Sequence, residues 1–430
     1  MRTVLNVFFL GLLNALFLFF SANPINMGTK NSAIEIASGA NFVINNEITD
    51  FKGKVIKNTG ANISGENITF DNGVFQEGNN ENYITGVLDE TNQRIELNGN
   101  KSFKGIKGQI KKALRISGDE NRLEGDPFFA SNISLVDSSS SLTCAIAGAL
   151  SCDVQLNDGT LYLENNLSFV DEKKIIGPGI VKLNKRNLTF GAKEFSVTTS
   201  LYFDNASDVE LNSNMHMNSR WTFSGGENVF NGNGNIVYLD TGGQIIIERG
   251  SSLLVKNVIL HKISGVFACL DNLGTASFQS VRVILDNDCT FSQGCFEVLD
   301  KLSVAGAYKW VYQSAKRSKI CSKAKLTMEQ GLTLSYDPLV ASRDLIFLED
   351  ASSSIFLKNS TIHSTSTGMQ LTKGILEIEG NSFLSSEASC QAEGIMIGDG
   401  VSSANDLTIN VLRDSSLKLL TGYLIYDNVA

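Results

Sequence analysis

Short runs in which apolar and polar residues alternate fill most of the chain after about residue 30. Examples are "GTLYLENNLSF" from Gly159, "GIVKLNKRNLTF" from Gly179 and "GILEIEGNSF" from Gly374. Helical periodicity is scarce, and each run ends at Asn, Gly, Asp or Ser. Alternation of this kind is typical of half-buried strands, and these small polar residues favour tight turns. The pattern therefore predicts many short strands separated by turns.

Strand-like phrases recur at a nearly constant spacing in the second half of the chain. "LLV" at 253, "FQS" at 278, "LSV" at 302, "LTM" at 326 and "IFL" at 355 follow one another in steps of 25, 24, 24 and 29 along the numbering. We predict that Leu253, Phe278, Leu302, Leu326 and Ile355 lie on successive coils of a repeat and point inward.

A longer phrase is also written twice. "SSLLVKNVILH" at 251–261 returns as "SSIFLKNSTIH" at 353–363. If His261 and His363 occupy one slot four coils apart, roughly 19 Å separates them at the spacing of parallel strands. A shared proton relay or metal site needs direct contact. The repeated histidine therefore indicates architecture and not catalysis.

Three of the seven cysteines give a second measure of the period. The steps from Cys269 to Cys295 and from Cys295 to Cys321 are equal, at 26 each. Equal steps predict one inward position on successive coils, a core ladder of small apolar side chains. Stacked Cα atoms about 4.8 Å apart also lie within the range of a disulfide, so an oxidised ladder is the alternative. Cys144 and Cys152 bracket a short segment that a disulfide could close.

A period of roughly 21 to 29 residues with short strands favours an all-β fold, a parallel β-helix. One coil cannot bury its inward side chains alone, and stacking creates the core. A propeller needs a period near 40, a leucine-rich repeat needs its own leucine signature, and a sandwich does not predict equal cysteine steps. We expect an irregular N-terminal part of β coils or a cap over 23–135 and a regular β-helix over 136–430.

The pattern over roughly 30–430 resembles the right-handed parallel β-helix superfamily of pectin-lyase-like proteins and bacterial adhesin passengers. The resemblance implies a right-handed solenoid and a secreted or cell-surface protein with a non-enzymatic, adhesin-like binding or structural role. The alternative that it implies is a polysaccharide-active lyase or glycoside hydrolase. The polygalacturonase set of Asn-Thr-Asp, Asp-Asp, Gly-His-Gly and Arg-Ile-Lys is absent from the sequence, as are pectate-lyase motifs. No catalytic residue, metal ligand or cofactor is therefore assigned.

The first residues, "MRTVLNVFFLGLLNALFLFFSANP", have a positive start at Arg2 and an apolar run from Val4 to Phe20. This predicts a secretory signal peptide over 1–22, with an uncleaved anchor as the alternative. No later segment is long and apolar enough to span a bilayer. We therefore expect an exported bacterial protein.

The formal net charge of −9 and the pI near 5.1 argue against a nucleic-acid partner. Two basic stretches break the acidic average, at 101–115 and at 308–325, and the second, "YKWVYQSAKRSKICSKAK", also carries aromatic residues. In an extended segment its aromatic residues share one face and, beside cations, could grip an acidic glycan or another cell-surface component. The candidate binding residues are Tyr308, Trp310, Tyr312, Lys316, Arg317 and Lys319. The alternative is that the rings pack inward and the cations are solvated.

Overall fold

The computed structural model is an all-β parallel solenoid of about 15 turns, which confirms the predicted fold class. It describes residues 33–44, 48–51, 53–78, 80–105, 112–125, 130–146, 148–197, 200–204, 206–266, 268–269, 271–365, 367–390 and 393–429. The predicted signal peptide lies outside these residues. The chain divides into two compact units, residues 1–182 and residues 183–430, and each is described by itself.

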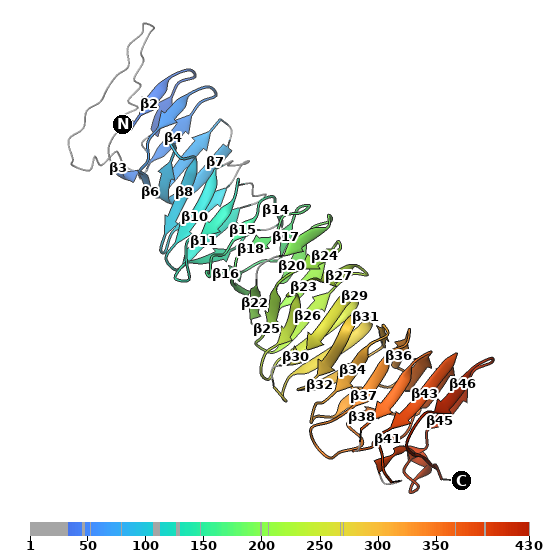
Figure 1. Ribbon diagram of the computed structural model, residues 1–430. Coiled ribbons are helices and arrows are strands. Elements are labelled where there is room, and N and C mark those ends of the chain that lie inside the picture. Colours follow the sequence, from blue (N-terminus) through green and yellow to red (C-terminus); the bar gives the residue numbers. More distant parts are fainter. Residues whose placement is uncertain are drawn as a thin grey trace. The chain divides into compact units, whose positions relative to one another are not determined.

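Unit 1 winds its strands around three sides (Figure 1). One side stacks β8 (Arg94–Asn98), β10 (Ala113–Ser117), β12 (Ile133–Leu135), β15 (Val154–Gln155) and β18 (Ile175–Ile176). The next stacks β9 (Ser102–Gly105), β11 (Asn121–Gly125), β13 (Ser141–Cys144), β16 (Thr160–Leu163) and β19 (Gly179–Lys182). The third holds β14 (Gly148–Leu150) and β17 (Leu167–Phe169). All of these pairings are parallel.

One antiparallel strand interrupts the start of unit 1. Strand β7 (Asn80–Asp89) folds back on β6 (Ile68–Glu77), and it pairs antiparallel with both β8 and β9. The strands before it are parallel again: β1 (Ala33–Ile36) with β4 (Lys54–Lys57), β2 (Asn41–Val43) with β5 (Asn62–Ser64), and both β3 (Ile48–Phe51) and β4 with β6. The interruption falls within the segment that the sequence predicts to be irregular.

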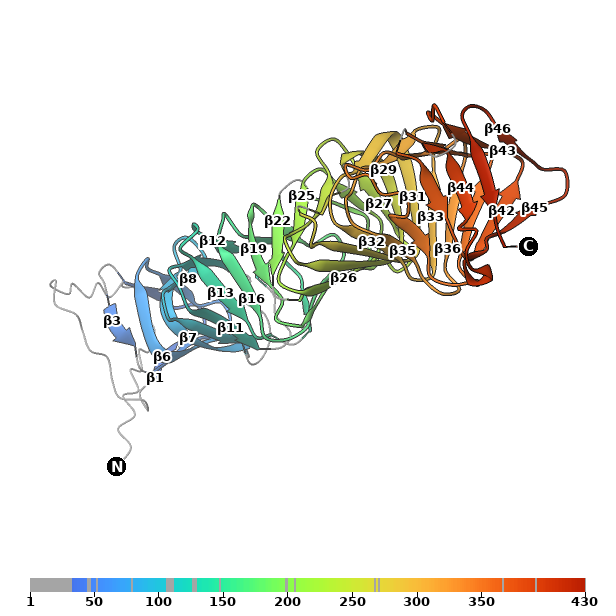
Figure 2. The ribbon, with the colours of Figure 1, turned by 90° about the horizontal axis from the view of Figure 1, so that it is seen from below.

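Unit 2 is also three-sided, and every pairing between its described strands is parallel. The first side runs β20 (Asn187–Phe190), β23 (Asp208–Leu211), β26 (Glu227–Asn231), the starts of β29 (Ser252–Val266) and β31 (Thr275–Phe291), β32 (Cys295–Val298), β35 (Ser318–Ile320) and β38 (Ile346–Leu348). Figure 2 shows β26, β32 and β35 along this side.

The second side of unit 2 carries the outward residues discussed below. It runs β21 (Phe195–Val197), β24 (Met215–Met217), β27 (Ile236–Leu239), the middle of β29 and of β31, β33 (Lys301–Ala305), β36 (Lys325–Glu329), β39 (Ser354–Lys358), β42 (Ile375–Glu379) and β45 (Thr408–Val411).

The third side of unit 2 completes each coil. It comprises β22 (Leu201–Asp204), β25 (Arg220–Phe223), β28 (Gln244–Ile247), β30 (Ala268–Cys269), the ends of β29 and β31, β34 (Lys309–Tyr312), β37 (Thr333–Tyr336), β40 (Thr361–Ser364), β43 (Asn381–Ser386) and β46 (Ser416–Leu419). A separate parallel sheet joins β41 (Met369–Leu371), β44 (Ile395–Gly398) and β47 (Leu424–Asp427).

The five predicted core residues are all buried and lie on successive coils, as expected. Leu302, Leu326 and Ile355 are direct partners in one ladder. Leu253 and Phe278 belong to other ladders, because Leu253 pairs with Ala276 and Phe278 pairs with Val255. The spacing therefore predicts the inward face correctly but the exact register only in part.

The repeated phrase does not mark one slot of the coil. In the first copy, Asn257 turns the chain from the first side to the second, and in the second copy Asn359 turns it from the second side to the third. Both residues have a left-handed backbone, with φ of 51° and 49°. His261 pairs with Ile284, whereas His363 pairs with Ser335, so the shared-slot interpretation is wrong. The phrase encodes a strand–asparagine–strand corner that the fold uses twice.

The cysteine ladder is also wrong. Cys269 pairs with Ile247 and is buried, whereas Cys295 pairs with Thr275 and is partly exposed. Cys321 follows Ile320 at the end of β35 and is partly exposed as well. The physical reason is the local coil length, because the step between register partners here is 20 from 278 to 298 and 21 from 281 to 302. A step of 26 therefore shifts each cysteine to a different part of the coil.

Candidate functional site

The predicted aromatic platform at 308–319 faces the core. Trp310 and Tyr312 share one face of β34, as expected, but that face is the buried one. The Tyr312 hydroxyl donates to the Lys316 carbonyl oxygen and lies 3.0 Å from the Ser318 hydroxyl. Burial raises the pKa of Tyr312 to about 12. Neither ring can stack on a ligand from solvent, which corrects the binding hypothesis and supports its inward-packing alternative.

The remaining residues of that stretch do not form a free basic patch. Tyr308 is 39% exposed and stands just before β34, away from the two buried rings. Arg317 lies 4.2 Å from the Phe347 ring centroid and pairs with Asp344 at 3.0 Å. Lys319 lies 3.7 Å from Glu297 and 3.6 Å from Glu349, and Lys316 is exposed. Carboxylates beside Arg317 and Lys319 thus offset the charge expected to attract an acidic glycan.

A different cluster stands on the outer face of the second side of unit 2. His216, Tyr238 and His261 are successive partners across β24, β27 and β29. The His216 and Tyr238 rings stack with centroids 4.5 Å apart, and the Tyr238 and His261 centroids are 5.4 Å apart. We call these three residues the His-Tyr ladder. Their outward direction follows from alternation, because both neighbours of His216, Met215 and Met217, are fully buried.

Charged side chains surround the His-Tyr ladder. Asp240 Oδ2 lies 2.8 Å from His216 Nδ1, and Glu194 Oε1 lies 3.2 Å from His216 Nε2. Lys262 Nζ donates to Asp240 Oδ1 at 2.7 Å and lies 6.0 Å from the Tyr238 ring centroid. The hydrogen bonds from Lys262 and then His216 lower the pKa of Asp240, and the bond to Asp240 raises the pKa of Lys262.

This arrangement combines donors, acceptors and ring edges on an accessible surface. The side chains of Asp240 and His216 are 23% and 32% exposed. His261 Nδ1 is buried and has no hydrogen-bond partner. Among the described residues there is no group of three His, Cys, Asp or Glu side chains that could hold a metal ion. The cluster suits hydrogen bonding to a polar ligand, and its imidazole between two carboxylates could also move a proton.

Sequence reasoning missed this cluster, although a signal for it existed. His216, Tyr238 and His261 follow one another in steps of 22 and 23 along the numbering, close to one coil. The repeated phrases join strands of similar sequence, and these three strands are not similar. The signal that identifies them is the recurrence of polar and aromatic residues at coil-length steps.

Further along the second side, the outer face is covered by paired charges. Glu329 lies 3.0 Å from Arg282, and Lys325 lies 2.6 Å from Glu377. Lys358 and Glu379 are paired in the same way, at 2.9 Å. Exposed pairs of this kind contribute little to stability. They make this stretch of the sheet electrically balanced, in contrast to the surroundings of the His-Tyr ladder.

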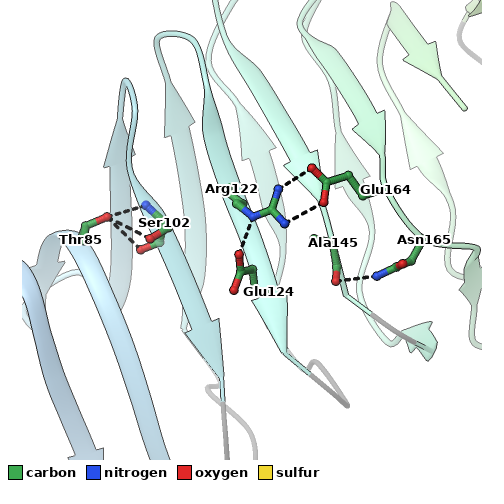
Figure 3. Close-up of polar contacts among 7 residues, drawn as sticks. All are labelled: Thr85, Ser102, Arg122, Glu124, Ala145, Glu164 and Asn165. Atoms are coloured by element: carbon green, nitrogen blue, oxygen red, sulfur yellow. Dashed lines mark hydrogen bonds and ion pairs between the residues drawn. The ribbon is translucent and has the colours of Figure 1, made fainter. Parts of the chain in front are cut away.

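Unit 1 has its own polar network on the outside of β11 and β16 (Figure 3). The Arg122 guanidinium donates to both Glu164 oxygens, at 2.5 and 2.7 Å, and Arg122 Nε donates to Glu124. These bonds, chiefly those to Glu164, raise the pKa of Arg122. Beside them, Asn165 Nδ2 donates to the Ala145 carbonyl oxygen at 2.8 Å. The network links three successive coils, since β13 lies between β11 and β16, and its groups pair with one another, which favours a stabilising role.

Among the described residues, no helix is both long and apolar enough to cross a membrane. No protein-family model, no curated protein and no solved structure matches the chain.

Proposed function

We propose that the protein is an exported, non-enzymatic binding solenoid with an adhesin-like role, secreted or held at the cell surface. The observation that carries the proposal is the His-Tyr ladder with its flanking Glu194, Asp240 and Lys262. Parallel coils repeat at about 4.8 Å, so an extended ligand lying along the second side meets polar groups at regular intervals.

The chemistry of the ladder favours a glycan of low negative charge. Asp240 and Glu194 accept hydrogen bonds, Lys262 donates them, and the rings add partly apolar surface. Sugars carry many hydroxyl groups that both donate and accept. Two carboxylates face one lysine here, so an acidic polymer would be repelled more than a neutral or amino-bearing one.

A glycan array on the purified mature chain tests this proposal. We expect binding to neutral or amino-bearing glycans, and a loss of at least about tenfold in affinity on Tyr238→Ala, since truncating an aromatic residue at the centre of a binding site costs about 2 kcal/mol or more. Phe356→Ala is the matched control, because Phe356 is an outward ring on the same side. An array without hits, or equal losses for both variants, would contradict the proposal.

The second candidate, a polysaccharide-active enzyme, has one observation in its favour. His216 lies between Asp240 and Glu194 on an accessible face, an arrangement that can serve general acid–base catalysis. A reducing-sugar assay on each glycan that binds separates the two functions. Product release that His216→Ala abolishes would establish the enzyme, whereas binding without product supports the adhesin-like role.

Export rests on the N-terminal sequence alone and is tested separately. We expect the mature protein to begin near Asn23, after cleavage behind Ala22. N-terminal sequencing of exported material decides this. Exported protein that begins at Met1 would show that the apolar segment is retained.

A further inference from the structure

The last described coil of unit 2 leaves its outer strand edges unpaired. We call β45, β46 and β47 the terminal coil. These strands bond to β42, β43 and β44 on one edge, and within the described residues none has a partner on the other edge. Figure 1 shows β45 and β46 at the C-terminal end of the stack. Such an edge is a template for another strand.

The inward positions of the terminal coil are apolar but uncovered. Val411 is 50% exposed, while its ladder partner Ile378 is fully buried. Leu419 is 43% exposed, while its partner Leu384 is fully buried. The same residue types that form the core one coil earlier thus face solvent here. Their pattern is that of a coil on which another coil stacks.

The third strand of the terminal coil repeats this contrast. Leu424 and Tyr426 are 39% and 66% exposed, and their partners Ile395 and Ile397 are fully buried. Natural solenoids and sheets protect an open edge with proline or with inward-pointing charges. The segment 408–427 contains no proline, and Arg413 and Asp414 lie in the turn after β45. Its other two charges, Lys418 on β46 and Asp427 on β47, alternate with the inward residues and therefore point outward. Proline and inward-pointing charges are thus absent from this described edge.

The chain itself contains an edge of matching form at its first described coil. Among the described residues, β1 and β2 are paired on one edge only, to β4 and β5, and that pairing is parallel. Ile34 and Phe42, which pair with the buried Val55 and Ile63, are apolar inward residues of that coil, and Ile36 on the same face of β1 is already buried. A parallel ladder continues only when the second edge comes from the opposite end of a stack. A contact between two terminal coils would instead be antiparallel.

We infer that the terminal coil docks the first coil of a second copy of this chain, so that copies associate head to tail. This contact goes beyond the proposed glycan binding and does not depend on it. It continues the three-sided parallel stacking that already holds neighbouring coils of unit 2. Because the two surfaces differ, the contact is heterologous, and two copies joined by one such contact still offer a free terminal coil and a free first coil to further copies.

Two variants, each with one damaged end, test the inference. Leu419→Lys places a charge on the terminal coil, and Phe42→Lys places one on the first coil. Mass photometry and sedimentation velocity across concentration measure the assemblies of the full chain. Circular dichroism and the melting temperature establish that each variant is folded, and Val411→Lys serves as a second terminal-coil variant. Asn410→Lys is the matched control, because Asn410 is the exposed outward neighbour of Val411.

We expect the unmodified chain and Asn410→Lys to form a concentration-dependent series of species without a fixed upper size. Each single-end variant alone should remain a monomer, and an equal mixture of the two should form a 1:1 dimer and stop there. A monomeric unmodified chain, a closed dimer, or a mixture that stays monomeric would overturn the inference. Self-association of Phe42→Lys alone would overturn it as well, since that result indicates contact between two terminal coils.

Discussion

At the residue scale, asparagine and glycine make the corners of the coils. Asn257 and Asn359 adopt a left-handed backbone, as does Gly380 one coil after Asn359. Asn359 also bonds between coils, since its side-chain oxygen accepts from the Asn381 backbone N–H at 3.0 Å. Both residue types tolerate this conformation better than others do. The abundance of such residues in the sequence is therefore a direct consequence of the number of corners.

Gly380→Ala should destabilise the protein more than Gly250→Ala. Both glycines have a positive φ, +67° and +66°, so alanine at either site costs about 1 kcal/mol in backbone strain. A Cβ at Gly380 would also overlap the Asn359 side-chain oxygen, whereas nothing lies within 4 Å at Gly250. Urea unfolding measures both variants. Equal losses in the free energy of unfolding would show that the Asn359 side chain moves away from the added Cβ without cost.

A charge in the core ladder should be costly. Leu326 is fully buried between Leu302 and Ile355, so Leu326→Asp places an unpaired carboxylate in an apolar interior. We expect a loss of several kcal/mol in the free energy of unfolding. Thr327→Asp, on the outward face of the same strand, should change stability little. A Leu326→Asp variant that melts like the unmodified chain would contradict the ladder.

At the scale of the element, strands β24, β27 and β29 are tied together by the charges around the His-Tyr ladder. The pKa of Asp240 is lowered by hydrogen bonds from Lys262 and His216. A depressed pKa stabilises the fold above the unfolded value of about 3.9 and ceases to do so as pH falls through the folded value. We expect Asp240→Asn to be less stable than the unmodified chain at pH 7, with the difference shrinking as pH falls below about 4. Thermal unfolding across this range measures it, and a constant difference would contradict the assignment.

An apolar cavity of about 30 Å³ lies between the second and third sides of unit 2. Val283, Val304 and Trp310 are among its lining residues. We expect Val304→Ile, which adds one methylene group at the cavity, to stabilise the protein by about 0.8 kcal/mol. Val298→Ile is the control, because Val298 is fully buried but does not line the cavity, so extra volume there should destabilise. Calorimetric melting distinguishes the two, and equal losses would show that the cavity cannot be filled.

The sequence predicts the type of element better than the register between elements. Alternation identified inward residues such as Leu302 and Leu326, because every strand has one buried face. Register depends on corner length, and coils of unit 2 differ: the step between partners is 20 from 278 to 298 but 29 from 326 to 355. This variation in coil length is the reason why the cysteine ladder was wrong. The burial of Trp310 and Tyr312 has a different cause: alternation places both rings on one face of the strand but does not tell which face is inside.

At the scale of the whole molecule, the seven thiols report on the core along most of the chain. Cys144, Cys152, Cys269 and Cys289 are buried, Cys295 and Cys321 are partly exposed, and Cys390 is exposed. Burial raises the pKa of Cys144 and of Cys269 to about 12 and that of Cys152 to about 11. Only the thiolate reacts with an alkylating reagent, so limited solvent access and a small thiolate fraction both slow the reaction of the buried cysteines.

Alkylation of the native chain, followed by peptide mass spectrometry, should therefore label the thiols in three groups. We expect Cys390 first, Cys295 and Cys321 next, and the four buried thiols only after unfolding. This order of labelling distinguishes the structure from the cysteine ladder predicted from equal sequence steps, which requires Cys269, Cys295 and Cys321 to react alike. Labelling in urea provides the control, because all seven should then react at similar rates. If Cys269 is labelled as fast as Cys390 in the native chain, the coils around it open far more readily than their packing implies.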